Sequence, residues 1–308
     1  MTMVHKAVLT DDVLKYLSVC RAGICVDCTL GEGGHSRAIL ERLKPQRLVA
    51  LEADAAILAN ARQNLGDFAN VTFINDNFVR LAGLLKEQKI EGVNAILMDL
   101  GVSLYHYRES GRGFSFDRDE PLDMRIDTRS PLTADEVVNS YPPEKLKQIF
   151  WAYGEERWTS LIVRVIVERR QKAAIRTSKE LADLVSSVIP KKFHAKIHPA
   201  TRVFQAIRIE VNNELDNLEQ VIDGAAGCLV KGGRLAIISF HSLEDRIVKH
   251  RFQALAEGRI VDEVRGTRAE ADYKILTKKP VEAREAEKND NPSARSAKLR
   301  VLERVRAG

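Results

Sequence analysis

The chain has 308 residues and a net charge of +5, with 44% hydrophobic and 30% charged residues, 18 glycines and 9 prolines. This composition excludes collagen-like, low-complexity and wholly disordered chains, and the length suggests about two domains. No apolar run approaches the ~18 residues of a membrane span, and the charged N-terminal segment lacks the core of a signal peptide. Four cysteines without a spaced framework fit a reducing compartment, so we expect a cytoplasmic protein with no membrane partner.

Short apolar runs alternate with helical patterns at both ends of the chain. The sequence predicts strands over residues 24–29, 47–52, 71–75, 94–99 and 233–240. It predicts helices over residues 36–43, 54–65, 78–88 and 213–229. Strands separated by helix-length patterns indicate a doubly wound α/β fold with a parallel sheet. Residues 272–277 and 299–305 are predicted to form a closing antiparallel hairpin, with residues 278–291 as an exposed connection.

The alternation stops in the middle of the chain. There, a loop rich in Gly, Asp and Arg (109–130) and a proline pair precede helical patterns over residues 144–151, 158–171 and 178–188. We therefore predict a mainly helical domain of residues 105–211, inserted into a discontinuous domain of residues 1–104 and 212–308. Within it, the helical spacing of Trp151 and Trp158 favours core positions over base-stacking platforms.

Basic side chains concentrate in this middle region. Residues 157–208 carry 12 basic and 3 acidic side chains, a local net charge of +9. Such a stretch is either a footprint for a polyanion or a solvated helix face, and charge alone leaves both interpretations open. The first interpretation predicts phosphate contacts from a set of basic residues: Arg164, Arg169, Arg170, Lys172, Lys191, Lys192 and Lys196.

A glycine-rich loop follows the first predicted strand, where an open α/β sheet binds its ligand. A dinucleotide fingerprint would have its third glycine at Ser36, and the Gly-Lys-Ser/Thr of a P-loop is absent. The pattern of Gly31, Gly33 and Gly34 instead resembles the first motif of S-adenosylmethionine-dependent methyltransferases, with a purely structural turn as the alternative. Glu52, which ends the second strand, could accept the hydroxyl hydrogens of a ribose from either NAD or S-adenosylmethionine.

Three further patterns allow two interpretations each. After the third strand, Phe78 could form an apolar wall for an adenine, while Asp76 or Asn77 could equally be a helix cap. Cys25 and Cys28 have C-x-x-C spacing, but no second Cys/His pair follows, so we expect neither zinc nor redox chemistry. Residues 239–245 contain Ser, His and Asp without a nucleophile elbow, so we do not expect a hydrolase triad.

Six motifs in the same order carry a family resemblance. They are AILMDLGVS (95–103), GRGFSF (111–116), PLDMR (121–125), HPATRVFQAIRIEVN (198–212), SFHSLEDR (239–246) and NPSARSAKLR (291–300). From about residue 4 to residue 305 the chain resembles the bacterial 16S ribosomal RNA cytosine-N4 methyltransferases, the RsmH or MraW family. The resemblance implies a class I (Rossmann-like) methyltransferase domain, S-adenosylmethionine as donor, no metal, and a cytidine in the decoding region as acceptor.

The resemblance also implies roles for individual residues. It assigns catalysis to Asp99 and the backbone carbonyl of Leu100, which would hold the hydrogens of the cytosine amino group. The family often has Asp where this chain has Glu52, and its usual Gln contact falls here on His106. The donor-binding residues that it implies are Gly31, Gly33, Gly34, His35, Glu52, Phe78, Asp99 and His106.

The expected partners are 16S ribosomal RNA and the small ribosomal subunit, with no DNA, and a homodimer is left open. Two other classes of function compete: a ribosome-assembly protein with a degenerate methyltransferase fold, and an NAD-dependent oxidoreductase. Intact Gly33, Gly34, Glu52 and Asp99 argue against degeneration, and Ser36 argues against NAD. A titration of S-adenosylmethionine against NAD would separate the three.

Overall fold

The computed structural model describes residues 7–194, 198–257, 260–262, 267–268 and 270–306, so Lys196 lies outside the described residues. The chain divides into two compact units. The first combines Met1–Gly101 with Leu215–Gly308, and the second is Val102–Glu214.

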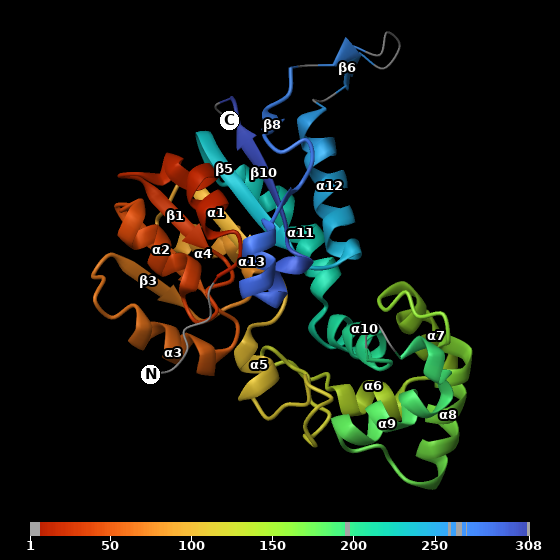
Figure 1. Ribbon diagram of the computed structural model, residues 1–308. Coiled ribbons are helices and arrows are strands. Elements are labelled where there is room, and N and C mark those ends of the chain that lie inside the picture. Colours follow the sequence, from red (N-terminus) through yellow and green to blue (C-terminus); the bar gives the residue numbers. More distant parts are fainter. Residues whose placement is uncertain (1–6, 195–197, 258–259, 263–266, 269, 307–308) are drawn as a thin grey trace. The chain divides into compact units, whose positions relative to one another are not determined.

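The first unit is built on one mixed sheet with the strand order β3-β2-β1-β4-β5-β10-β8 (Figure 1). The first five strands run parallel, and β10 runs antiparallel to β5, β8 and β9. Strand order reverses beside β1, as in doubly wound sheets, so the predicted fold class is confirmed. The strands are β1 (Ile24–Asp27), β2 (Arg47–Leu51), β3 (Val71–Ile74), β4 (Val93–Asp99), β5 (Leu229–Ser239), β8 (Tyr273–Ile275), β9 (Val281–Glu282) and β10 (Lys298–Arg304).

Successive side chains of a strand lie on opposite faces of the sheet, and in this sheet both faces carry buried apolar residues. Helices therefore cover both faces. Cys25 and Leu48 belong to one buried cluster, whereas their chain neighbours Val26 and Val49 belong to another. The first cluster is covered by α1 (Thr10–Leu17), α2 (Gly34–Arg42) and α3 (Ala55–Asn64), and the second by α4 (Leu81–Glu87), α11 (Glu214–Gly227) and α12 (Ser242–Ala256). The short elements of this unit are β6 (Ile260–Asp262), β7 (Thr267–Arg268) and α13 (Glu285–Asp290).

Two sequence-based predictions in the C-terminal half of the chain need correction: the start of β5 and the segment 278–291. Strand β5 begins at Leu229, four residues before the predicted start, because Gly232 adopts φ +79° and the strand absorbs the glycine pair as an irregularity. The antiparallel pairing of the last strands is confirmed, with Leu302 opposite Ile275. The segment 278–291, however, is no simple exposed connection: it forms β9 and α13, and Ala283 is buried.

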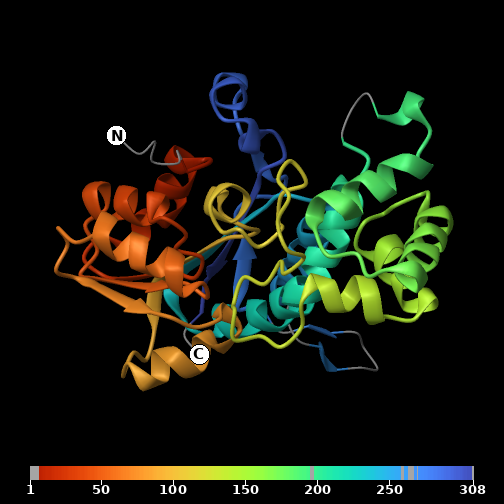
Figure 2. The ribbon, with the colours of Figure 1, turned by 90° about the horizontal axis from the view of Figure 1, so that it is seen from below.

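The second unit is helical and has a core of its own. Its helices are α5 (Leu104–Arg108), α6 (Ala134–Ser140), α7 (Pro143–Ala152), α8 (Thr159–Lys172), α9 (Ser178–Val188) and α10 (Thr201–Asn212). Figure 2 shows α6 to α10, in yellow-green to green, gathered in one cluster. Trp158 packs against the core as predicted, but Trp151 is 68% exposed, so its predicted core position is wrong. Within the described residues, no helix has the length and apolar character that crossing a membrane requires.

Candidate active site

The carboxyl ends of β1, β2 and β4 lie side by side, because β1 is hydrogen-bonded to both neighbours. The loops that follow these strands therefore meet at one edge of the sheet, beside the reversal of strand order. Ligands of open α/β sheets bind at this position. We refer to the residues at these strand ends and in these loops as the carboxyl-edge site.

The glycine-rich loop connects β1 to α2 through two left-handed residues. Gly31 has φ +52° and Gly33 has φ +89°, and Gly33 is the residue that precedes the first turn of α2. Non-glycine side chains rarely adopt such conformations, so the loop requires glycine at Gly33 on backbone grounds alone. Gly34, the first residue of α2, completes the loop.

Asp27, the last residue of β1, holds the glycine-rich loop through two hydrogen bonds. Its Oδ1 accepts a hydrogen bond from the Thr29 N–H at 3.1 Å, and its Oδ2 accepts one from the Ser36 hydroxyl at 2.7 Å. Burial raises the pKa of Asp27, although the Ser36 hydrogen bond opposes that shift. No sequence pattern predicted this role, yet Ser36 occupies the position of the third glycine of a dinucleotide fingerprint. In this chain that position supplies a hydrogen bond to the strand.

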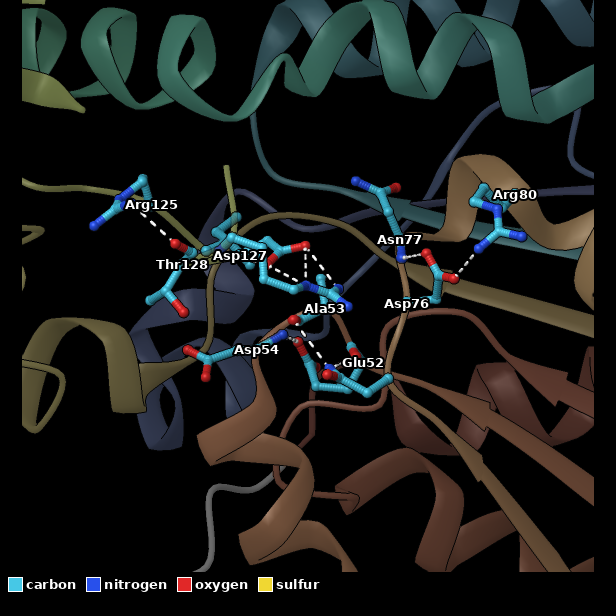
Figure 3. A network of polar contacts seen from close by, with 12 residues as sticks. Glu52, Ala53, Asp54, Asp76, Asn77, Arg80, Arg125, Asp127 and Thr128 are labelled. Atoms are coloured by element: carbon cyan, nitrogen blue, oxygen red, sulfur yellow. Dashed lines mark hydrogen bonds and ion pairs between the residues drawn. The ribbon is translucent and has the colours of Figure 1, made fainter. Parts of the chain in front are cut away.

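Glu52, directly after β2, contacts the glycine-rich loop. Its Oε2 accepts a hydrogen bond from the Gly31 N–H at 2.9 Å, and its Oε1 accepts one from the Asp54 N–H at 3.0 Å (Figure 3). Asn75 donates from its side-chain amide to the Glu52 and Ala53 carbonyls, which fixes the backbone at the end of β2. Burial raises the pKa of Glu52 to about 7, against the two backbone hydrogen bonds.

Asp99, the last residue of β4, lies against the same loop. Its N–H donates to the Thr29 hydroxyl at 2.6 Å, and its Oδ2 lies 3.5 Å from His35 Nε2. Burial by itself would lower the pKa of His35, but the carboxylates of Asp99 and Asp27 outweigh it and raise that pKa. Asp99 Oδ1 is buried, and no donor among the described residues reaches it. The next residue, Leu100, donates its N–H to the Ile238 carbonyl of β5.

The loop after β3 contains both features that the sequence left open. Asn77 caps the short 3₁₀ turn Phe78–Arg80, with its Oδ1 accepting a hydrogen bond from the Val79 N–H at 3.0 Å. Asp76 accepts from the Asn77 N–H and pairs with Arg80 (Figure 3). Phe78 is half-buried against the core cluster that contains Val26, so its side chain is only partly used in packing.

His106 belongs to the second unit, where its ring is fixed locally. It is buried in α5, its Nδ1 accepts a hydrogen bond from the Ser103 N–H at 3.1 Å, and its ring centroid lies 4.9 Å from that of Phe114. The predicted contact of His106 with a donor therefore stays a prediction.

The C-x-x-C spacing has a simple structural explanation. A separation of three residues reverses the side of a strand on which a side chain lies. Cys25 accordingly belongs to one buried cluster and Cys28 to the cluster on the opposite face. The two thiols therefore do not share one face of the sheet, where a single metal ion or a disulfide would need them.

Ser239, His241 and Asp245 each have a separate structural partner. The His241 ring accepts from the Glu244 N–H as part of the cap of α12, and the Ser239 hydroxyl donates to the Lys298 carbonyl. Asp245 holds Arg300 through both carboxylate oxygens at 2.7 and 3.1 Å. These three side chains stabilise a helix start and a strand pairing.

Many basic side chains of residues 157–208 have local partners. Carboxylates lie near the cationic groups of Arg164 (3.9 Å from Glu168), Arg169 (3.8 Å from Glu180), Arg176 (3.2 Å from Asp135), Lys179 (3.6 Å from Asp183) and Arg208 (2.8 Å from Glu214). Arg170 donates to the Val138 carbonyl. Lys172 and Lys191 are exposed and form no ion pair with the residues that the structure describes.

Comparisons with known proteins identify the family of this chain. The model of the MraW methylase family matches residues 2–305. A protein of Clostridium botulinum (strain Loch Maree) named ribosomal RNA small subunit methyltransferase H is 43% identical over 98% of this chain and 99% of its own length. The protein of the same name from Thermosipho melanesiensis is 44% identical over 98% of both chains. A putative rRNA-methylase structure from Clostridium thermocellum aligns with 12% identity and a TM-score of 0.45, too distant to support a conclusion.

Proposed function

Because the chain belongs to the MraW methylase family, we propose that it methylates 16S ribosomal RNA with S-adenosylmethionine as donor. We further propose that the acceptor is the exocyclic N4 amino group of a cytidine in the decoding region. The related proteins are named for the ribosomal RNA of the small subunit, which supports the first statement. The second depends on the chemistry of the carboxyl-edge site.

The residues at the carboxyl edge fit a nucleoside donor. The left-handed turn at Gly33, with φ +89°, gives the loop before α2 a backbone shape that non-glycine residues rarely adopt. Each oxygen of Glu52 accepts one backbone N–H, which leaves lone pairs for two ribose hydroxyls. We assign donor binding to the residues expected from the family resemblance: Gly31, Gly33, Gly34, His35, Glu52, Phe78, Asp99 and, from the second unit, His106.

The observation that carries the proposal is Asp99 Oδ1 at the end of β4, which has no hydrogen-bond partner among the residues that the structure describes. A buried carboxylate oxygen without a donor is costly, and its natural complement is an N–H group of a ligand. Bound S-adenosylmethionine supplies an electrophilic methyl group. The lone pair of a cytosine amino nitrogen is delocalised into the ring, so acceptors that hold its hydrogens help to localise it. Asp99 and the Leu100 carbonyl would be those acceptors, and alignment would supply most of the acceleration.

Methylation at carbon C5 by the usual covalent route would instead need an accessible cysteine. Cys20, Cys25 and Cys28 are all buried in the two clusters of the first unit. Cys228 directly precedes β5, at the opposite edge of the sheet from the carboxyl ends. No thiol among the described residues is therefore offered to a base at the carboxyl-edge site.

We assign RNA binding to the second unit, residues 102–214. A cytidine must leave its stack to reach the methyl group, which costs a few kcal/mol. Phosphate contacts by basic side chains can offset that cost, and Lys172 and Lys191 are exposed without an ion pair among the described residues. Exposed ion pairs such as Arg164–Glu168 are weak enough to exchange a carboxylate for a phosphate.

The test measures methyl transfer to a 16S ribosomal RNA fragment at saturating S-adenosylmethionine, with the target as cytidine or as uridine. Asp99→Asn keeps the shape of the side chain but removes the charged acceptor. We expect it to lower turnover by at least a hundredfold, as for loss of an electrostatic contact to the reacting group. Cys28→Ala should retain much of the activity, apart from a packing cost in the core.

Mass mapping of the product nucleoside identifies the methylated atom. Methyl transfer to the uridine RNA at a comparable rate would overturn the N4 assignment. So would a Cys28→Ala enzyme that binds the donor normally but has no activity. Failure of the wild-type protein to methylate small-subunit RNA in any state of assembly would overturn the proposal as a whole.

A further inference from the structure

A cavity of the first unit shares no residue with the carboxyl-edge site. It has a volume of about 440 Å³ and lies between α12 and the strands β8 and β10. These three elements pack against one another (Figure 1). The apolar part of its wall includes Phe252 and Tyr273, so the cavity lies directly over the hydrophobic core.

Every charged side chain that the structure describes in the wall of this cavity is cationic. Lys249 comes from α12, Lys274 from β8, Lys278 from the segment after β8, and Arg300 from β10. Among the residues that the structure describes, the lining contains no Asp or Glu, so they offer no carboxylate ligand for a metal ion. A cavity lined by positive charge favours an anionic ligand.

Arg300 differs from the three lysines in its partner. It is only 7% exposed, and Asp245 holds its Nε and Nη2 in a two-point ion pair. Burial alone would raise the pKa of Asp245, but Arg300 and Lys298 outweigh it and keep that pKa below its usual range. Asp245 therefore balances Arg300, while Lys298 approaches the same carboxylate at 3.6 Å.

The three lysines lack such a balance. Lys249, Lys274 and Lys278 are exposed, and none forms an ion pair with any residue that the structure describes. They come from separate elements, so it is the fold that brings their positive charges together around this cavity. Ammonium groups on flexible stems are suited to phosphate as point charges.

We propose that this cavity binds a backbone phosphate of the RNA substrate. The inference rests on the proposed function, because the ligand that it names is part of that substrate. It gives the first unit an RNA contact of its own, besides those of the second unit. RNA is favoured over a free phosphate compound because the proposed substrate carries phosphates at every nucleotide and is already bound to the protein in the same reaction.

The test compares two triple variants that each remove three positive charges from the first unit. The first is Lys249→Gln with Lys274→Gln and Lys278→Gln. The matched control is Lys44→Gln with Lys86→Gln and Lys89→Gln, three exposed lysines outside the cavity. Affinity for a 16S ribosomal RNA fragment is measured at several salt concentrations, together with S-adenosylmethionine affinity and thermal unfolding.

We expect the cavity variant to flatten the slope of log affinity against log salt by about 0.7, the value for one lost phosphate contact. Between about 50 and 200 mM salt this difference changes the affinity ratio about 2.6-fold. The control should keep the wild-type slope, and a third variant with Arg at the three cavity positions should restore it. Donor affinity and thermal unfolding should match the wild type in all three variants.

Equal slopes in the cavity variant and the control would overturn the inference. It would also be overturned if the cavity variant lost affinity for inorganic phosphate or ATP while its RNA affinity stayed unchanged, because the site would then serve a free phosphate compound. If the wild-type protein methylates the RNA while the slopes are equal, only this inference fails. If the wild-type protein neither binds nor methylates the RNA, the proposed function fails with it.

Discussion

The carboxyl-edge site and the basic stretch of residues 157–208 use charge in opposite ways. At the carboxyl edge, the carboxylates of Asp27 and Glu52 are buried, and each of their oxygens accepts a defined hydrogen bond. In the basic stretch, exposed side chains form ion pairs at distances such as 3.9 Å for Arg164 with Glu168. Hydrogen-bond geometry therefore defines the carboxyl-edge site, whereas net charge defines the basic stretch.

This difference predicts how the two regions respond to solution conditions. Buried hydrogen-bonded groups are screened little by salt, whereas exposed charges are screened over a Debye length of about 8 Å at physiological ionic strength. We therefore expect donor binding to depend on backbone shape and on pH near neutrality. RNA binding should depend on salt.

The largest expected effect comes from Gly33→Ala, which should abolish detectable donor binding. Gly33 has φ +89°, and a Cβ there would lie 3.1 Å from a Leu65 methyl group. The left-handed backbone should also cost about 1–2 kcal/mol of unfolding free energy. Calorimetry with S-adenosylmethionine and a denaturant titration measure the two effects.

The matched control is Gly224→Ala in α11, where a Cβ meets nothing within 4 Å. It should keep donor affinity and stabilise the helix by about 0.5–1 kcal/mol. A folded Gly33→Ala protein with wild-type donor affinity would contradict the assignment of this loop.

Glu52→Gln should weaken donor binding by about 1.5–3 kcal/mol at pH 8, the range for hydrogen bonds to a charged group. Because the pKa of Glu52 is about 7, wild-type affinity should fall as the pH drops below 7, while the variant should show no such dependence through this group. Calorimetry across pH 5.5–8.5, taken as about three units around that pKa, measures both. Equal pH profiles for the two proteins would exclude Glu52 from the ribose position.

The same carboxyl group should affect stability with the opposite pH trend. The folded pKa of about 7 lies above the ordinary 4.5, so the folded donor-free protein binds the proton more tightly. Its contribution to stability is complete below pH 4.5 and is lost as the pH rises to 7. At about 1.4 kcal/mol per pKa unit, this loss is about 3 kcal/mol. Denaturant titrations should show that Glu52→Gln removes this decline, and a parallel decline in the variant would contradict it.

A combined Lys172→Gln, Lys191→Gln and Lys192→Gln variant should flatten the salt dependence of RNA affinity by about 2. These three lysines of the second unit are exposed. Donor affinity should not change, because the variant leaves the strand ends and their loops intact. The measurement is RNA affinity against salt, and an unchanged slope would identify the basic stretch as a solvated helix face.

The smallest expected effect concerns Trp151, which is 68% exposed on α7. If bases stack on it, Trp151→Ala should lower RNA affinity by about 1 kcal/mol, or about fivefold. Trp158 is the internal control, since it packs against the core of the same unit. Tryptophan fluorescence should be quenched by RNA in the wild type but not in Trp151→Phe. Equal quenching in both proteins would place the RNA away from Trp151.

The amino-acid sequence was enough to locate most strands and the candidate site residues that follow them. Short apolar runs predicted β1 to β4 to within a few residues, because strand patterning is local. Gly33, Glu52 and Asp99 could be singled out because each lies at or shortly after the end of a buried strand. The paired glycines of residues 232–233 were misleading, since a strand can absorb them as an irregularity that only the pairing of β4 with β5 shows.

Contacts between distant parts of the chain depended on the tertiary fold. The bond between Gly31 and Glu52 spans 21 residues, and the Asp245–Arg300 pair spans 55. Neither separation leaves a periodic signal in the sequence. The core position predicted for Trp151 was wrong, because helical spacing defines a stripe but does not say which side of the helix meets the core. Burial is a property of the packed molecule, and it is burial that raises the pKa of Glu52 and leaves an oxygen of Asp99 without a partner among the described residues.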